Sequence, residues 1–390
     1  MIKQASRPPH IYLSCGEASG DRYGAALMHA FKRECPDVRV SAMGGPMLAM
    51  AGADVVVPSE PISVMGFGEV LARWRPILKT RRQVWKVIDQ GDIDMVVPID
   101  FPGFNLRLAA HAKNQGLPVF YVVPPQLWAW GSWRIRKLRR NVDQVGTILP
   151  FEQEWFSSRN VNAIALGHPL MEDYSGYPFE AQRRQREDRM QDPDTPLTVG
   201  IMPGSRQQEI ERLLPLMKVT AGIIQTWLGR RRVRVVVSQA PGVDLDRLAA
   251  MAGEKCEITD EPLPMLYEKV DLAMVCSGTA SLEASLAGVP HAVVYRTSSF
   301  NFSLARRLVK VPYIGLANLI LDRPMAPEHI QDDADPSHLA GSLLAFLNTP
   351  GRRDEFYRDC NDLRKRCGGA GVWRRTARAI LNLLEHRKEG

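Results

Sequence analysis

The sequence of 390 residues is 45% hydrophobic and 24% charged, a balance that is typical of globular proteins and excludes disorder along the whole chain. Its formal net charge of +7 favours an anionic partner, such as a phosphorylated substrate, a nucleic acid or an acidic membrane, although solubility alone would also account for it. The six cysteines form no C-x-x-C pair, so we expect reduced thiols and no disulfide framework.

The N-terminal segment has only a short apolar run, Ile11 to Leu13, which is too short for a signal peptide. No segment approaches the roughly 20 apolar residues that a membrane span needs. We therefore expect any contact with a membrane to be peripheral.

In the first half of the chain, short apolar runs bounded by Gly, Pro and Asp alternate with amphipathic stretches. The runs that predict buried strands are Ile11–Cys15, Val38–Met43, Met95–Ile99, Val119–Val123, Gln144–Leu149 and Ala163–Leu166. Arg22–Glu34 and Arg107–Gln115 between them have helical spacing. Alternation of buried strands with helices predicts a parallel, doubly wound sheet.

The pattern changes at the polar segment Tyr174–Pro196, which predicts a short polar helix and a linker. A second series of strands and helices follows, at Val199–Met202, Ile210–Leu228, Val233–Val237, Leu245–Ala252, Leu272–Cys276, Ala280–Ala287 and Ala292–Tyr295. Helices are expected over Pro336–Arg387.

We therefore predict an α/β protein with two Rossmann-like, doubly wound domains. The predicted bounds are 1–170 for the N-terminal domain, 171–196 for the linker, 197–345 for the second domain and 346–390 for a helical tail. Since ligands of such sheets bind beyond the carboxyl ends of the strands, we expect the active site in the cleft between the two domains.

Two loops of the first domain could carry chemistry. The loop Gly16–Asp21 follows a strand and begins a helix, whose N-terminal amides could bind an anion or a sugar oxygen. Alternatively, Ser19 or Asp21 only caps this helix. Asp100 ends an apolar strand, where a carboxylate could accept a proton from an attacking hydroxyl, or could be a turn residue.

Two loops of the second domain suit a nucleotide. Pro203–Arg206 combines a Gly-Ser turn with an arginine at a helix start, which favours a diphosphate. In the loop that follows Cys276, Thr279 and Ser281 could cap a helix or bind phosphate. Glu283 could accept ribose hydroxyls or be an ordinary first-turn acid. The histidines are scattered and indicate no metal site, and His168 is expected to be structural.

Two basic, amphipathic stretches suit a membrane surface. In Phe67–Ile88, tryptophans and aliphatic residues recur at helical spacing among basic residues, and Pro76 predicts two short helices or one kinked helix. In Trp128–Arg140, three tryptophans precede basic residues. A core-facing surface helix is the alternative for the first stretch. Because no nucleic-acid motif accompanies either stretch, a lipid partner is favoured and nucleic acid is not expected.

Together these segments resemble the lipid A disaccharide synthase family. The motifs that carry the resemblance, in the family's order, are Gly16-Glu17-x-Ser19-Gly20-Asp21, Ile99-Asp100-x-Pro102-x-Phe104-Asn105, Pro125-x-x-Trp128-Ala129-Trp130, Leu149-Pro150-Phe151-Glu152, Gly167-His168-Pro169-Leu170, Pro203-Gly204-Ser205-Arg206-x-x-Glu209-Ile210, Ser277-Gly278-Thr279-Ala280-x-Leu282-Glu283, Asn318-Leu319 and Pro327-Glu328-x-x-Gln331. Each motif is weak alone, but the ordered set is specific.

The resemblance implies a GT-B fold of two facing Rossmann-like domains, and a reaction that needs no metal and no cofactor. It implies inverting transfer of 2,3-diacylglucosamine from UDP-2,3-diacylglucosamine to the 6-hydroxyl of 2,3-diacylglucosamine 1-phosphate, with release of UDP. The expected location is the cytoplasm, peripheral on the inner face of the cytoplasmic membrane. The family also has homodimers with exchanged C-terminal segments, in which Asn318 could serve a neighbour's site.

The resemblance also assigns roles to residues. Asp100 matches the proposed base and Arg206 the essential arginine of the family. The donor site is expected at Gly204, Ser205, Arg206, Ser277, Gly278, Thr279, Glu283 and Asn318. The acceptor side is expected at Gly16, Glu17, Ser19, Gly20, Asp21, Asn105, Trp128, Trp130 and Arg134.

The sequence departs from the family pattern at Pro98, Gly103, Pro124 and Gly131. All four lie in the acceptor-side domain, so they bear on the acceptor more than on the donor. Two alternatives stay open at this point: another GT-B activity, such as a different lipid-linked sugar transfer or epimerisation of a UDP-sugar, and a non-catalytic nucleotide-sugar or lipid-binding protein. Retention of Asp100, Arg206 and Glu283 together argues against the latter.

Overall fold

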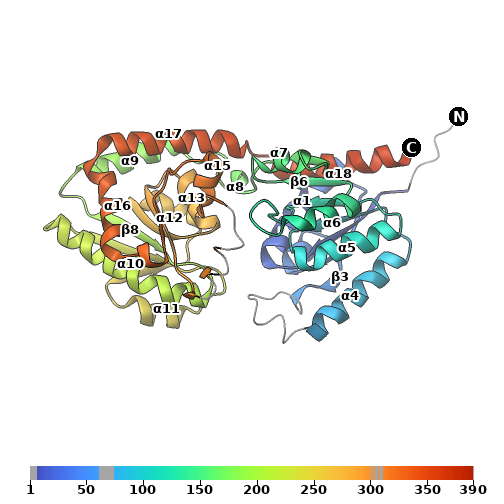
Figure 1. Cartoon of the computed structure of the whole chain (residues 1–390), viewed down its shortest axis with the longest axis horizontal. Coiled ribbons are helices and arrows are strands. Elements are labelled where there is room, and N and C mark those ends of the chain that lie inside the picture. The colour runs from blue at the N-terminus through green and yellow to red at the C-terminus, as the bar shows by residue number, and fades with distance from the viewer. Residues whose placement is uncertain (1–6, 61–73, 300–301, 304–305, 307–310, 390) are drawn as a thin grey trace. The chain divides into compact units, whose positions relative to one another are not determined.

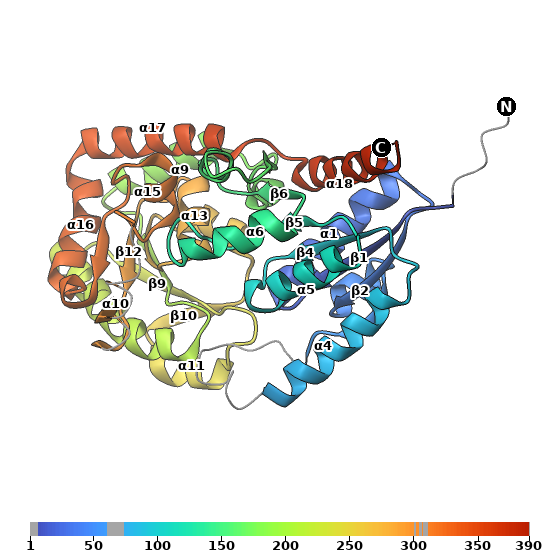
Figure 2. The same ribbon diagram turned by 45° about the vertical axis from the view of Figure 1, so that its right-hand side comes forward.

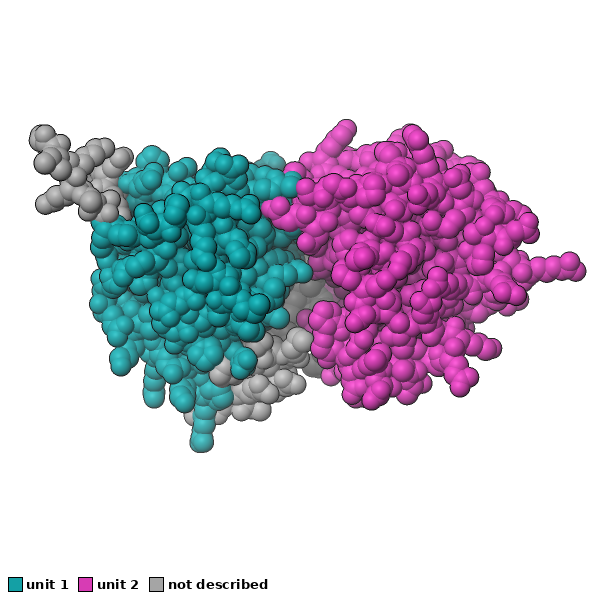
Figure 3. Space-filling model, turned by 180° about the vertical axis from the view of Figure 1, so that it is seen from behind, with its two compact units in different colours: residues 1–169, 370–390 teal, residues 170–369 magenta. Residues whose placement is uncertain are grey.

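The computed structural model describes residues 7–60, 74–299, 302–303, 306 and 311–389. The chain divides into two compact units, shown in different colours in Figure 3. Unit 1 comprises Met1–Pro169 and Ala370–Gly390, and unit 2 comprises Leu170–Gly369. Each unit is a parallel sheet covered by helices (Figure 1), which confirms the predicted doubly wound α/β class.

The sheet of unit 1 has the strand order β3-β2-β1-β4-β5-β6-β7, with every pair parallel. Its strands are β1 (His10–Cys15), β2 (Arg39–Gly44), β3 (Asp54–Pro58), β4 (Met95–Ile99), β5 (Phe120–Val122), β6 (Gln144–Thr147) and β7 (Ala163–Ala165). The chain builds the sheet outward from β1 in one direction and then from β4 in the other. The switch point therefore lies between β1 and β4, where Cys15 pairs with Ile99.

The helices of unit 1 cover both faces of this sheet (Figure 2). They are α1 (Ala18–Glu34), α2 (Pro46–Met50), α4 (Trp74–Asp89), α5 (Pro102–Asn114), the short 3₁₀ helix η2 (Ser132–Arg134), α6 (Ile135–Asn141), α7 (Glu152–Ser157) and α18 (Val372–Glu389). Along β1, Leu13 packs in the core with α1 and α18, and the adjacent Tyr12 packs with α4 and α5. Burial on both faces explains why the successive residues Ile11, Tyr12 and Leu13 are all apolar.

Helix α4 is continuous from Trp74 to Asp89 and is not interrupted at Pro76, one of the two outcomes predicted there being a kink. Pro76 lies in the first turn, where a missing backbone N–H breaks no helical hydrogen bond. Residues 67–73 of the predicted amphipathic stretch lie outside the described residues. Among the helices that the structure describes, none is long and apolar enough to cross a membrane.

Unit 2 has the strand order β10-β9-β8-β11-β12-β13, again all parallel. Its strands are β8 (Leu197–Met202), β9 (Val233–Ser238), β10 (Cys256–Thr259), β11 (Leu272–Cys276), β12 (His291–Tyr295) and β13 (Glu328–Ile330). Its helices are α8 (Leu170–Asp173), α9 (Phe179–Gln191), α10 (Gln207–Leu228), α11 (Leu245–Ala252), α12 (Leu263–Lys269), α13 (Thr279–Leu286), α15 (Leu316–Leu321), the 3₁₀ helix η3 (Gln331–Asp333), α16 (Pro336–Asn348) and α17 (Pro350–Cys367). The switch point lies between β8 and β11.

The segment 171–196, expected to be a linker, is instead packed into unit 2. The fully buried guanidinium of Arg186 in α9 donates hydrogen bonds to the carbonyl oxygens of Tyr267, Val270 and Gly288, at 2.7–2.9 Å. Three carbonyl acceptors satisfy a buried cation that would otherwise be costly. One polar residue of this helix is therefore a buried contact that joins the helix to the unit.

The segment expected as one helical tail, 346–390, is divided between the units. Helix α17 packs against α13 and α15 in unit 2, whereas α18 lies beside α1 in unit 1 (Figures 1 and 2). Ile380 and Leu384 of α18 are buried in the core of unit 1, and Glu34 of α1 pairs with Arg374 and Arg378. The apolar stripe of α18 thus completes one face of the first sheet.

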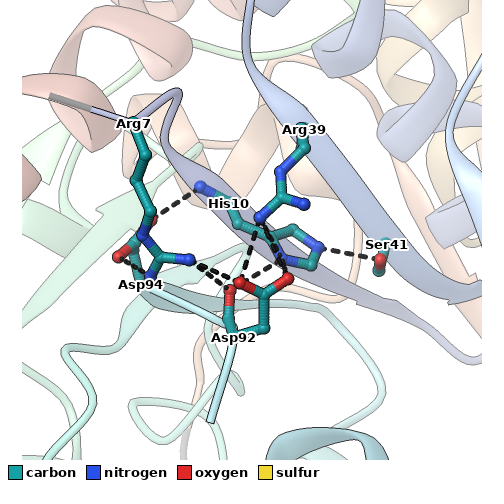
Figure 4. A network of polar contacts seen from close by, with 6 residues as sticks. All are labelled: Arg7, His10, Arg39, Ser41, Asp92 and Asp94. Atoms are coloured by element: carbon teal, nitrogen blue, oxygen red, sulfur yellow. Dashed lines mark hydrogen bonds and ion pairs between the residues drawn. The ribbon is translucent and has the colours of Figure 1, made fainter. Parts of the chain in front are cut away.

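A polar network closes the amino ends of β1, β2 and β4, at the opposite end of the strands from the loops considered below (Figure 4). His10 Nε2 lies 2.8 Å from Ser41 Oγ, and Asp94 accepts a hydrogen bond of 2.8 Å from the backbone N–H of His10. The network consists of Arg7, His10, Arg39, Ser41, Asp92 and Asp94. Since Arg7, Arg39 and Asp92 are half exposed, their ion pairs stabilise the fold only modestly.

Candidate active site

At the switch point of unit 1, the loop after β1 meets the loop after β4. Gly16 follows β1 directly, and the ring of Phe101 lies against its α-carbon. Both Asp100 and Phe101 have positive φ angles, 51° and 50°, which are uncommon for residues with a side chain. Strained backbone of this kind costs on the order of 1–3 kcal/mol per residue and persists only where its surroundings hold it.

Asp100 is held by hydrogen bonds to its own carbonyl oxygen. Tyr121 Oη and Asn105 Nδ2 both donate to that oxygen, each at 2.7 Å. Burial raises the pKa of the Asp100 carboxyl, and a hydrogen bond from the Phe101 backbone N–H partly opposes this rise. A fixed carboxylate with a raised pKa is a stronger proton acceptor than an exposed one.

Two residues expected on the acceptor side are buried braces. Asn105 is fully buried, and besides Asp100 it bonds Ser14 and Ile99, so that it ties the end of β1 to the end of β4. The buried carboxylate of Asp21 accepts hydrogen bonds of 2.7–3.2 Å from the backbone N–H groups of Gly45, Met47 and Leu48. These buried contacts hold the loops that follow β1 and β4 in place.

The remaining predicted acceptor-side residues differ in exposure. Gly16 and Gly20 are buried, Ser19 is half-buried and Glu17 is exposed, all around the start of α1. Trp130 is 41% exposed, and the guanidinium carbon of Arg134 lies 4.2 Å from the centroid of its ring.

Trp128 is held by a buried carboxylate. Its Nε1 donates to Glu152 Oε1 at 2.9 Å, and its ring packs edge-on against Phe151. Glu152 also accepts from the backbone N–H groups of Ile148 and Leu149, and burial raises the pKa of Glu152 to about 7 in spite of these three donors. Neither Glu152 nor Tyr121 was predicted as a site residue, although Glu152 lies in a family motif.

In unit 2, the loops after β8 and β11 lie side by side at the switch point, because these two strands pair directly. Burial raises the pKa of the Cys276 thiol to about 12, with a further contribution from Glu209 that Arg206 opposes, which places all three near one another. The guanidinium of Arg206 is 66% exposed, and its Nη1 lies 3.1 Å from Glu209 Oε1. Arg206 is therefore a surface cation whose position Glu209 restrains.

The other donor-side residues surround the start of α13. Gly204 is half-buried and Ser205 exposed; Gly278 and Thr279 are exposed, and the backbone amides of the first turn of α13 follow them. Ser277 Oγ donates to the carbonyl oxygen of Ile314 at 3.0 Å.

The carboxylate of Glu283 lies near Tyr267. It adds to the rise that burial causes in the pKa of that tyrosine. Tyr267 Oη in turn donates to the carbonyl oxygen of Ala280 in α13, at 2.9 Å.

Asn318 is 1% exposed and is bonded within its own chain. Its Nδ2 donates to the carbonyl oxygen of Ala326 and to Glu328 Oε1, at 2.7 and 2.8 Å, and its Oδ1 accepts from the N–H of Ala326. Glu328 also accepts from the N–H groups of Ile314 and Gly315. The structure thus links Asn318 to the Ser277 loop indirectly, through Glu328 and Ile314.

Within the described parts of both units, no group of three or more His, Cys, Asp and Glu side chains could hold a metal ion. His168 is buried, and its burial lowers its pKa to about 4. It is therefore a neutral residue at ordinary pH.

Comparison with known proteins identifies the family. The model of the lipid-A-disaccharide synthetase family matches residues 11–369. The lipid-A-disaccharide synthase of Trichlorobacter lovleyi is 34% identical over 383 residues, which cover 97% of this chain and 98% of that protein. The lipid-A-disaccharide synthase of Coxiella burnetii is 31% identical, over 96% and 98% of the two chains. This chain belongs to the lipid-A-disaccharide synthetase family.

Solved structures with lower identity share the fold. Acinetobacter baumannii MurG is 16% identical with a TM-score of 0.57, and the alignment covers 97% of this chain and 100% of that chain. A putative UDP-N-acetylglucosamine 2-epimerase from Listeria monocytogenes is 13% identical with a TM-score of 0.60, over 98% of each chain. These likenesses, and that to a glycosyltransferase of kitacinnamycin, confirm the predicted GT-B fold.

The fold alone does not decide the activity, because proteins described as an epimerase and as a glycosyltransferase share this fold. Membership of the lipid-A-disaccharide synthetase family distinguishes between these two activities. The predictions of the family and of the enzyme class, a glycosyltransferase, are both confirmed. The match begins one residue into β1 and ends before α18. It therefore includes every predicted site residue.

Proposed function

We propose that this member of the family transfers 2,3-diacylglucosamine from UDP-2,3-diacylglucosamine to the 6-hydroxyl of 2,3-diacylglucosamine 1-phosphate. The products are the β-1,6-linked disaccharide precursor of lipid A and UDP. The observation that supports this assignment most directly is the Asp100 carboxylate, held on a strained loop at the switch point of unit 1 within a chain of this family.

Asp100 acts as the general base of an inverting displacement. As the 6-oxygen of the acceptor attacks the anomeric carbon of the donor, its proton passes to the Asp100 carboxylate. The bond between the anomeric carbon and the UDP oxygen breaks, and UDP leaves with that electron pair. The raised pKa of Asp100 makes its carboxylate a stronger proton acceptor than an exposed one.

Unit 2 holds the donor. Arg206 supplies an exposed guanidinium for the diphosphate, and the backbone of Gly204, Ser205 and Ser277–Thr279 lies beside it at the carboxyl ends of β8 and β11. Glu283 accepts the ribose hydroxyls. These contacts stabilise the charge that develops on the leaving diphosphate, and the displacement itself requires no metal.

The protein meets its lipid substrates at the inner face of the cytoplasmic membrane, as a peripheral protein. Trp133 is 68% exposed, and α6, which follows it, exposes basic side chains in the described structure. Those side chains are Arg136, Lys137, Arg139 and Arg140. Basic residues near an anionic bilayer each contribute about 1 kcal/mol, and tryptophan suits the interface. The formation of a homodimer remains a prediction, which light scattering of the protein in detergent would test.

The decisive experiment is a product assay on purified protein with both acylated substrates in detergent, in which UDP and disaccharide are followed by mass spectrometry. Wild-type protein should form disaccharide in step with UDP. Asp100→Asn should lose at least about 100-fold in kcat and still bind UDP, whereas the exposed control Asp37→Asn should match wild type. Normal turnover by Asp100→Asn would remove the base assignment. UDP binding without disaccharide from wild type would mean a different acceptor.

A further inference from the structure

Arg134 is held in unit 1 by stacking. Its guanidinium lies over the ring of Trp130, with 4.2 Å between the guanidinium carbon and the ring centroid. Gly131 leaves room for it: this residue has φ of 69°, and a β-carbon there would lie 2.7 Å from Arg134 Nη2. A glycine in a left-handed conformation therefore lets the arginine fold back over the tryptophan.

The charge of this guanidinium is not neutralised within the part of the chain that the structure describes, where no ion pair involves Arg134. Its buried Nε also has no hydrogen-bond partner there. Arginines elsewhere in the unit do pair; Arg39, for example, lies 2.9 Å from Asp92. A positioned guanidinium with unused donors is suited to a phosphate, whose oxygens it can bind in pairs.

Tyr121 connects this cation to the base. The Tyr121 hydroxyl donates to the carbonyl oxygen of Asp100 at 2.7 Å. Burial raises the pKa of Tyr121, the charge of Asp100 adds to this rise and the charge of Arg134 opposes it, so both groups lie near the phenol. The unpaired cation therefore lies near the loop that presents Asp100.

We propose that Arg134 binds the phosphate of the acceptor, a phosphomonoester on the anomeric carbon of a glucosamine. This inference rests on the proposed function. In such a sugar, the carbon that bears the phosphate and the carbon that bears the 6-hydroxymethyl group both flank the ring oxygen. A protein that holds the phosphate at Arg134 can therefore present the 6-hydroxyl to Asp100 nearby. Trp130 positions the guanidinium by stacking, and Gly131 has no β-carbon that would collide with it.

The test compares binding of two acceptors, 2,3-diacylglucosamine with and without its 1-phosphate, in detergent and in the Asp100→Asn background so that no turnover occurs. The parent should bind the phosphorylated acceptor about 10- to 100-fold more tightly. Arg134→Gln should reduce this ratio to near one, and Arg134→Lys should keep part of it. Arg107→Gln, an exposed arginine of α5, should leave the ratio unchanged.

A ratio that stays above about tenfold in Arg134→Gln would overturn the inference, and so would equal affinity for both acceptors in the parent. If the parent binds the dephosphorylated acceptor too weakly to measure, Arg134→Gln must lower binding of the phosphorylated acceptor to the same limit. Any stronger binding would overturn the inference. Failure of wild-type protein to form disaccharide would instead refute the proposed function.

A phospholipid headgroup offers similar chemistry, and sedimentation with phosphatidylglycerol vesicles distinguishes it. We expect Arg134→Gln to bind such vesicles as wild type does. Loss of vesicle binding with an unchanged acceptor ratio would assign the cation to the membrane and overturn the inference.

Discussion

The ring of Phe101 covers Gly16 so closely that a β-carbon on residue 16 would lie 2.1 Å from Cδ1 of the ring. Phe101 is joined directly to Asp100, and both have positive φ angles. A side chain at residue 16 must therefore displace the ring and with it the carboxylate. We expect Gly16→Ala to lower kcat about 10- to 100-fold, because small displacements of a catalytic group are costly. Steady-state kinetics with both substrates measure this loss.

Gly103→Ala is the matched control for that prediction. Gly103 lies in α5, two residues after Phe101, and a β-carbon there would meet no atom within 4 Å. Its kcat should stay close to that of wild type. Since unit 2 holds the donor loops, UDP affinity should be unchanged in both variants. Equal kcat for Gly16→Ala and Gly103→Ala would show that the ring of Phe101 does not position Asp100.

How far the sequence predicts the fold depends on where a strand lies in its sheet. Met95–Ile99 and Leu272–Cys276 were predicted with their observed bounds, because central strands are buried on both faces and are continuously apolar. Strands β3, β10 and β13 were missed. All three are edge strands, as is β7, whose apolar sequence was predicted as a strand; β10 and β13 contain polar residues with partly exposed side chains. The polar residues of β10 and β13 interrupt the apolar run by which a buried strand is predicted.

The site shows a related limit. The loops of Asp100 and Arg206 could be predicted because each follows a buried strand and opens a helix. The bracing contacts of Asp21 with Gly45, and of Asn105 with Ser14, could not, since these partners lie 24 and 91 residues away in the sequence. The burial of Glu152 against Trp128 depends in the same way on how distant segments pack.

Glu152 should make stability depend on pH in a defined direction. Burial raises its pKa from about 4.5 to about 7, so the folded state holds this proton more tightly than the unfolded state. The contribution of this shift to the free energy of unfolding is fully present below about pH 4.5 and is lost as the pH rises through about 7. The loss amounts to at most about 3 kcal/mol. Thermal unfolding of wild type and Glu152→Gln across this range should show the melting temperature of wild type falling relative to that of the variant.

Glu154→Gln controls for the loss of a carboxylate from the same helix, because Glu154 is an exposed residue of α7. Its melting temperature should run parallel to that of wild type at every pH. A wild-type curve that instead rises relative to Glu152→Gln with pH would mean that the three hydrogen-bond donors outweigh burial and that the pKa of Glu152 is lowered.

Replacement of Asn318 should lower the stability of unit 2 directly and the affinity for UDP only indirectly. Asn318→Ala leaves the N–H and carbonyl groups of Ala326 without their buried partner, at about 1–3 kcal/mol for each unpaired group. UDP affinity should fall only through the loosened Ile314 loop. Urea unfolding and UDP titration measure the two effects, with the exposed Asn348→Ala as control. Weaker UDP binding at unchanged stability would instead make Asn318 a direct ligand of UDP.

Helix α18 should be required for the stability of unit 1, although it lies beyond the residues that match the family model. Ile380 is fully buried among the side chains of the first core, so Ile380→Ala leaves a cavity and should destabilise the unit by about 2–5 kcal/mol. Asn382→Ala, an exposed change two residues on, should have little effect. Limited proteolysis with mass spectrometry should show earlier cleavage within 7–169 in Ile380→Ala alone, and equal protection of both variants would show that α18 is dispensable for this core.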